Sequence, residues 1–209
     1  MDISSLWLRH SRSRRVVAQG ASRGFSLIEL LVVTGILIVI TGLMLANHSR
    51  FGGKILLENL AYDMALSMRE AQVYGISVLR FGASTYTAGY GMHFAVSTPT
   101  SYTLFGDAIQ VDGLFTAGET VKTYSIDRGY RIEKLCTPAG TDIASCTSVS
   151  VLDVLYKRPE PDAWISANGN SCTVSAGNCK ESARIGLVSP SGDRSDFVVD
   201  INGQVSVNR

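Results

Sequence analysis

The side chain in the most unusual setting is Glu29, a carboxylate near the start of a long apolar run. Residues 25–46 read FSLIELLVVTGILIVITGLMLA, and Glu29 is the only ionisable side chain among these 22 positions. An ionisable group at the centre of a membrane costs about 2.5–3.5 kcal/mol and needs a partner. Cleavage between Gly24 and Phe25 would create one, because the new α-amino group of Phe25 is positively charged. Such a pair between neighbouring copies would fix their register more than it would add stability.

The four cysteines fall into two local pairs, Cys136 with Cys146 and Cys172 with Cys179. Their spacings, C-x9-C and C-x6-C, match no zinc framework. Disulfides are favoured if this part of the chain is exported, because an oxidising compartment preserves them. Buried free thiols are the alternative. Four cysteines allow three pairings, and we expect sequence neighbours to pair.

Residues 107–119 contain part of a calcium-loop pattern. Asp112 and Glu119 fall at the fifth and twelfth positions of such a loop, with a glycine at the sixth. The first and third positions, which should carry oxygen ligands, hold an alanine and a glutamine, and Asp107 is out of register by one. We interpret the segment as a turn between strands, with calcium at Asp107, Asp112 and Glu119 as the weaker hypothesis.

Catalytic patterns do not stand out in the sequence. The three histidines are His10, His48 and His93, and none of them belongs to a defensible Ser/His/Asp arrangement. The sequence also lacks a Walker loop and a glycine-rich dinucleotide turn after a strand. We therefore expect no enzyme and no cofactor.

The charge of the chain is distributed unevenly. Five of the 19 basic residues precede residue 25, against one acid, and residues 25–209 carry 14 basic and 17 acidic side chains, a formal −3. Nucleic-acid binding needs a basic face or cluster, and the chain ends with a single arginine, Arg209. We therefore do not expect nucleic acid as a partner. The basic block precedes the apolar run directly, where a cytoplasmic flank is expected.

The apolar run has the length of a membrane-spanning helix, since about 20 helical residues cross the hydrocarbon core. A secretory signal peptide has a shorter apolar core, about 7–15 residues, and ends in small residues. Here the run ends in Leu-Met-Leu-Ala-Asn at 43–47. A cleavable secretory signal is thus disfavoured, and an uncleaved membrane anchor is the main alternative to cleavage at Gly24.

The stretch RGFSLIELLVV at 23–33 resembles the prepilin cleavage and methylation motif of type IV pilins and type II secretion pseudopilins. The resemblance implies that a membrane aspartyl peptidase cuts after Gly24 and methylates the new N-terminus at Phe25. It also places Glu29 at the fifth mature position. A glycine before the cut leaves the backbone accessible to a protease.

This resemblance implies a structural subunit of a pilus or a secretion pseudopilus. The subunit would cross the inner membrane once, with its head outside the cytoplasm, before it joins the fibre. Its partners would be other pilin or pseudopilin subunits, the prepilin peptidase, the inner membrane and the assembly platform. The alternatives are a tip-located minor pilin that binds DNA, a surface or a secreted protein, and a plain single-pass anchored domain.

The elements that would position these residues are a long helix and a β-rich head. An apolar stripe of helical period continues beyond the membrane run, at 57, 60, 61, 64, 65, 68 and 71, and predicts a helix that ends near Gly75 and packs on a sheet. We expect a leader at 1–24, a membrane helix at 25–46, its amphipathic continuation at 47–75 and a head at 76–209. The fold class is α+β and pilin-like, with one antiparallel sheet.

Short runs of strand-forming residues follow residue 75. They predict strands near 77–81, 90–95, 101–105, 120–125, 131–135, 149–155, 183–188, 195–201 and 204–207. Asn202-Gly203 predicts a hairpin turn between the last two, and 166–180 is expected to be a surface loop. Residues 60–72 and the closing stretches 185–189, 191–192 and 201–207 resemble the H-type pseudopilins and FimT-like minor pilins.

Overall fold

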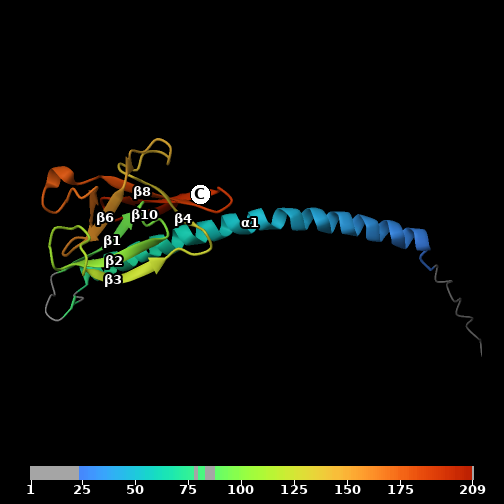
Figure 1. Ribbon diagram of the computed structural model, residues 1–209, viewed down its shortest axis with the longest axis horizontal. Helices are drawn as coiled ribbons and strands as arrows, with labels where there is room; N and C mark the ends of the chain where they lie inside the picture. The colour runs from blue at the N-terminus through green and yellow to red at the C-terminus, as the bar shows by residue number, and fades with distance from the viewer. Residues whose placement is uncertain (1–23, 78–79, 83–87, 209) are drawn as a thin grey trace, which may run out of the picture. The chain divides into compact units, whose positions relative to one another are not determined.

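The computed structural model describes residues 24–77, 80–82 and 88–208, with the backbone alone at 46–51 (Figure 1). Two compact units make up the chain, Met1–Leu45 and Ala46–Arg209. Of the expected leader, only Gly24 falls within the described residues.

The first unit contains the beginning of helix α1 (Leu27–Ile76). Its residues Leu27–Leu45 are long and apolar enough as a helix to cross a membrane, and all of their side chains are exposed. A helix that is apolar on every face must be buried in something other than water. The expectation of an N-terminal apolar helix is therefore confirmed.

The second unit contains the rest of α1 and two five-stranded antiparallel sheets, where the sequence predicted one sheet. The first sheet has the strand order β3-β2-β1-β6-β7. Its strands are β1 (Gly89–Ala95), β2 (Ser101–Asp107), β3 (Thr120–Ser125), β6 (Val151–Tyr156) and β7 (Ala163–Ala167). The fold class is thus α+β.

The second sheet has the strand order β10-β9-β8-β4-β5. Its strands are β4 (Arg131–Cys136), β5 (Ser148–Val149), β8 (Ser182–Val188), β9 (Arg194–Asp200) and β10 (Val205–Asn208). The hairpin predicted at Asn202-Gly203 joins β9 to β10, and Gly203 has the positive φ, 77°, that such turns require.

One hydrophobic core joins α1 to both sheets. The predicted helical stripe supplies Leu57, Ala61, Met64, Met68 and Ala71, all fully buried. The first sheet adds side chains such as Met92, Phe94 and Val154, and the second adds Ile185, Leu187 and Phe197. The stripe packs as the 3.6-residue period predicts.

The segment predicted as one strand at 149–155 belongs to two sheets. β5 pairs with β4 in the second sheet, and β6 pairs with β1 in the first, so the chain changes sheet at Ser150. Asn168 holds this crossing, because its Oδ1 accepts hydrogen bonds from Ser150 N (2.8 Å) and Ser150 Oγ (2.9 Å). The local sequence is rich in strand formers throughout and gives no sign of this change.

Two further expectations need correction. The strand predicted at 77–81 is absent from its described residues, because Ser77 lies in the turn after α1 and Phe81 makes a single β-bridge. Conversely, Ser166 and Ala167 were expected in a loop but form the end of β7, an edge strand that pairs with β6.

Helix α1, expected to end near Gly75, ends at Ile76. A Cβ at Gly75 would overlap the carbonyl oxygen of Tyr156 in β6. The glycine therefore lets the last turn of α1 approach the backbone of the first sheet closely.

Candidate functional site

The residues around the expected cleavage point form an exposed helix start. Phe25 is 81% exposed, and α1 begins two residues later at Leu27. Ser26 caps the helix, because its Oγ accepts the Glu29 N–H at 3.2 Å and its carbonyl accepts the Leu30 N–H at 3.2 Å. Gly24 and Phe25 thus lie outside the helix, before a defined cap.

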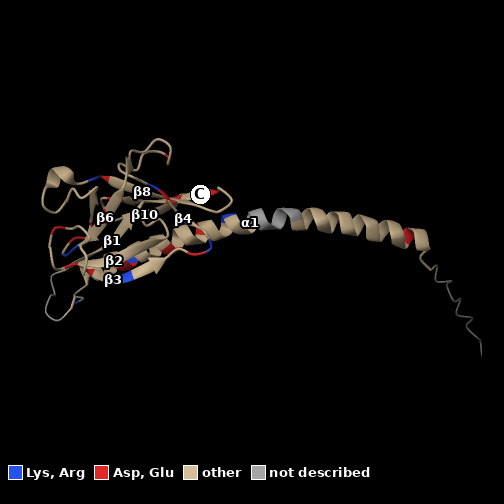
Figure 2. Ribbon diagram, viewed as in Figure 1, with Lys and Arg blue, Asp and Glu red and all other residues tan. Residues whose placement is uncertain are grey.

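Glu29 occupies the first turn of α1 and is the one charged residue in Leu27–Leu45 (Figure 2). An acid at this position interacts favourably with the helix dipole. Ser26 and Glu29 also have the S-x-x-E spacing of a capping box. The observed capping contact uses the backbone N–H of Glu29, and the S-x-x-E spacing in the sequence was not used to predict it. The carboxylate of Glu29 remains exposed and free to meet a charge on another chain.

The polar side chains further along this segment are satisfied within the helix. Thr34 Oγ1 donates to the carbonyl oxygens of Leu30 (2.9 Å) and Leu31 (3.1 Å), and Thr41 Oγ1 donates to that of Leu37 (2.7 Å). Such bonds let threonine lie in an apolar environment. Glu29 is therefore the one residue of Leu27–Leu45 that still demands a partner.

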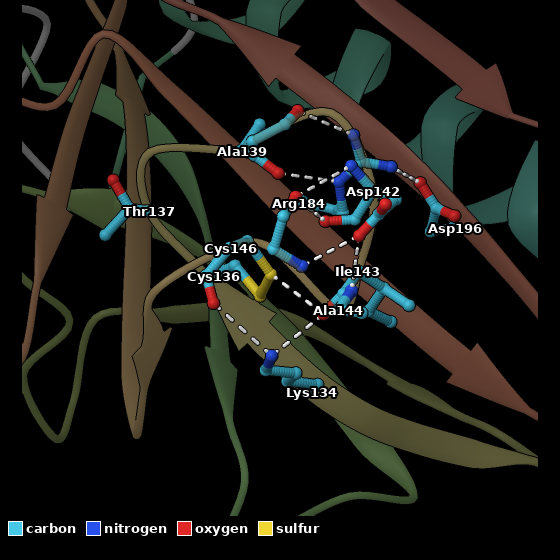
Figure 3. The surroundings of a disulfide bond; sticks show 12 residues. Lys134, Cys136, Thr137, Ala139, Asp142, Ile143, Ala144, Cys146, Arg184 and Asp196 are labelled. Carbon is cyan, nitrogen blue, oxygen red and sulfur yellow. Dashed lines mark hydrogen bonds and ion pairs between the residues drawn. A yellow bond between two sulfur atoms is a disulfide. The ribbon is translucent and has the colours of Figure 1, made fainter.

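The four cysteines form two disulfides between sequence neighbours, Cys136–Cys146 and Cys172–Cys179, as predicted. The loop closed by Cys136–Cys146 is also held by two cations (Figure 3). Lys134 Nζ donates to the carbonyl oxygens of Ile143 (2.8 Å) and Cys146 (3.3 Å).

The second cation is Arg184, which is only 4% exposed. Its Nε donates to Ala139 O at 2.8 Å and its Nη2 donates to Gly140 O at 3.0 Å. Its Nη1 pairs with Asp196 on the neighbouring strand β9 (Figure 3). Because every interaction is with the loop or with β9, this buried charge has a structural role.

The loop between β2 and β3 is organised by its own carboxylates. Glu119 is fully buried, and its Oε1 accepts the three consecutive amides of residues 108–110 at 2.8–3.1 Å. Its Oε2 accepts the amide of Thr116 at 3.0 Å. One side chain therefore fixes both ends of the loop.

Asp107 completes this arrangement from the end of β2. It is 2% exposed, and its Oδ1 accepts the amides of Asp112 and Gly113, each at 3.1 Å. Burial raises the pKa of Asp107 to about 6; the Gly113 amide opposes this rise, and the charge of Glu119 adds to it. In the described part of the chain, no group of three or more His, Cys, Asp or Glu is arranged to hold a metal ion. The calcium hypothesis stays an untested prediction, and the carboxylates of Asp107, Asp112 and Glu119 accept hydrogen bonds from backbone amides.

The loop covers the face of the first sheet that points away from α1. Its Phe115 ring lies 4.7 Å from the His93 ring and 5.8 Å from the Phe105 ring. His93 Nδ1 is 2.7 Å from Oδ1 of Asp153, which is almost fully buried on the adjacent strand β6. The pair is a packed polar contact under an aromatic ring, which is the arrangement expected of a structural histidine.

Comparison with known proteins found no protein-family model that matches this chain, and no curated protein or solved structure similar to it.

Proposed function

We propose that this chain is a subunit of a type IV pilus or type II secretion pseudopilus, cut after Gly24 and assembled through its N-terminal helix. The observation that carries the proposal is the position of Glu29. It is the one charged residue in an exposed apolar helix segment, and it follows Gly24 and Phe25 by four to five residues. An α-amino group at Phe25 of a neighbouring subunit would neutralise it.

The rest of the chain is compatible with this role. The apolar segment has the length to anchor the subunit in the inner membrane before assembly. The two disulfides suit a head outside the cytoplasm, in an oxidising compartment. The α+β head, with a helix packed on antiparallel sheets, suits a pilin-like subunit.

A plain membrane anchor is the competing account, in which Glu29 is only an acid at the capped start of α1. The substitution Glu29→Gln separates the two accounts, because glutamine keeps the capping-box side chain but carries no charge. Glu29→Ala removes both. The host should express a prepilin peptidase and an assembly platform, and the filaments sheared from its surface should be quantified.

We expect both variants to insert and to be cut after Gly24. If the charge recruits or aligns subunits, both variants should yield at least tenfold fewer filaments than wild type. Normal filaments from Glu29→Gln would contradict the proposed role of the charge.

A further inference from the structure

The dipeptide Asn-Gly occurs twice in the head, at Asn168-Gly169 and Asn202-Gly203, and lies in a turn each time. A glycine after asparagine leaves its own amide nitrogen unobstructed, because glycine has no Cβ. That nitrogen can attack the carbon of the asparagine side-chain amide and close a succinimide ring. Since the two sites share one dipeptide, their surroundings decide which of them reacts.

The side-chain oxygen of Asn168 lies among three hydrogen-bond donors. Its Oδ1 accepts bonds from Ser150 N (2.8 Å), Ser150 Oγ (2.9 Å) and Val151 N (3.3 Å). Because a backbone N–H can only donate, the oxygen of this amide, and not its nitrogen, must face the two backbone groups. Donors placed around a carbonyl oxygen stabilise the negative charge that develops on it during nucleophilic attack. The three donors therefore form an oxyanion hole for Asn168.

The nucleophile at this site, the amide nitrogen of Gly169, is accessible. Gly169 is exposed, and a Cβ added to it would meet nothing within 4 Å. Among the described residues, none accepts a hydrogen bond from its N–H. No hydrogen bond of this amide therefore has to break before attack, and the turn has open space in which to rotate.

The second site lacks both features. The Oδ1 of Asn202 accepts one backbone amide, that of Gln204 at 2.9 Å. The N–H of Gly203 donates to the carbonyl oxygen of Asp200 at 2.9 Å. Gly203 is buried, and a Cβ there would overlap the carbonyl oxygen of Pro161. The nucleophile at Asn202-Gly203 is thus already bonded and held in place.

We propose that Asn168 is a self-modification site, at which the amide nitrogen of Gly169 displaces the side-chain amide with the help of the donors at Ser150 and Val151. A bond forms between Gly169 N and Asn168 Cγ, the Cγ–Nδ2 bond breaks, and the Gly169 amide proton leaves with Nδ2 as ammonia. Water then opens the succinimide at one of its two carbonyl groups and gives aspartate or isoaspartate. The inference goes beyond the proposed function and does not depend on it.

The isoaspartate product would act on the crossing between the two sheets. In isoaspartate the main chain runs through the former Cγ of Asn168, so the oxygen that holds Ser150 and Val151 becomes part of a lengthened turn. The N–H groups of Ser150 and Val151 should then exchange their hydrogens faster than in the unmodified chain.

The test is incubation of the full chain in detergent at mildly alkaline pH, with each Asn-Gly site quantified by peptide-mapping mass spectrometry. In the folded chain, Asn168 should deamidate about fivefold faster than Asn202 or more, whereas in urea the two sites should react at similar rates. Ser150→Ala removes one of the three donors and should slow Asn168 by about threefold or more. Ser150→Thr keeps the hydroxyl and should retain the fast rate.

Asn202 is the internal control for folding, because its rate should rise to the value in urea if a variant unfolds the head. Two results would overturn the proposal. One is deamidation of Asn202 as fast as that of Asn168 in the folded wild type. The other is an unchanged or faster rate at Asn168 in Ser150→Ala, because the bonds to Oδ1 would then restrain the side chain rather than activate it. Neither result depends on cleavage after Gly24 or on a fibre, so both would leave the proposed function standing.

Discussion

At the scale of single residues, the acidic side chains of this protein differ in which groups compensate their negative charge. Glu119 is fully buried but accepts four backbone amides, so its charge is compensated inside its own loop. Glu29 is exposed in an apolar helix segment, and the capping contact there involves its backbone N–H rather than its carboxylate. A buried carboxylate that is hydrogen-bonded is structural, whereas an uncompensated one in an apolar setting requires an external partner.

Asp107 should give the head a distinct pH dependence. Its pKa of about 6, raised by burial, lies above the value of about 3.9 expected in the unfolded chain, so the folded state binds the proton more tightly. The stability that this proton contributes is complete below about pH 4 and is lost as the pH rises through about 6. Asp107→Asn should remove this dependence and keep an oxygen that can accept the amides of Asp112 and Gly113.

Chemical denaturation of the full chain in detergent, at pH 4 and pH 7, measures the effect. Between these pH values, the free energy of unfolding of wild type should fall by on the order of 1 kcal/mol more than that of Asp107→Asn. Titrating groups that do not interact with Asp107 affect both proteins alike, so their contributions cancel in the comparison. Parallel changes in the two proteins would show that Asp107 titrates normally.

At the scale of elements, the buried face of the helix was predictable because the helix's own sequence determines it. The period of its apolar stripe identified the buried residues Leu57, Ala61 and Met64. The change of sheet at Ser150 was missed because it depends on Asn168, which lies 18 positions away. Strand β7 was missed because its residues, AWISA, are few and are followed by a loop rich in Ser, Asn and Gly.

The contact between α1 and β6 provides a test of this packing. Gly75→Ala should destabilise the head by about 2 kcal/mol or more, because its Cβ would overlap the carbonyl oxygen of Tyr156 and force the helix away from the sheet. Gly52→Ala is the matched control in the same helix, since nothing lies within 4 Å of its added Cβ. Alanine should be neutral there or stabilise the helix by up to about 1 kcal/mol. Similar thermal melts for the two variants would contradict the close approach at Gly75.

At the scale of the whole molecule, the candidate site was predictable where it depends on local sequence. The sequence patterns predicted the apolar helix and the pairing of the cysteines. Contacts between segments distant in sequence were not predictable. Arg184 donates hydrogen bonds to the carbonyl oxygens of residues 139 and 140, and Ser171 bonds the carbonyl oxygen of Asp112. The residues around each of these side chains contain no sequence pattern that predicts the contact.

The proposed function requires that the chain is a precursor cut after Gly24. The most direct test is intact-mass and N-terminal peptide analysis of the protein recovered from membranes of a host that expresses a prepilin peptidase. The proposed function predicts a chain that begins at N-methylated Phe25. A chain that keeps residues 1–24 despite an active peptidase would contradict it, and would favour a plain membrane-anchored domain.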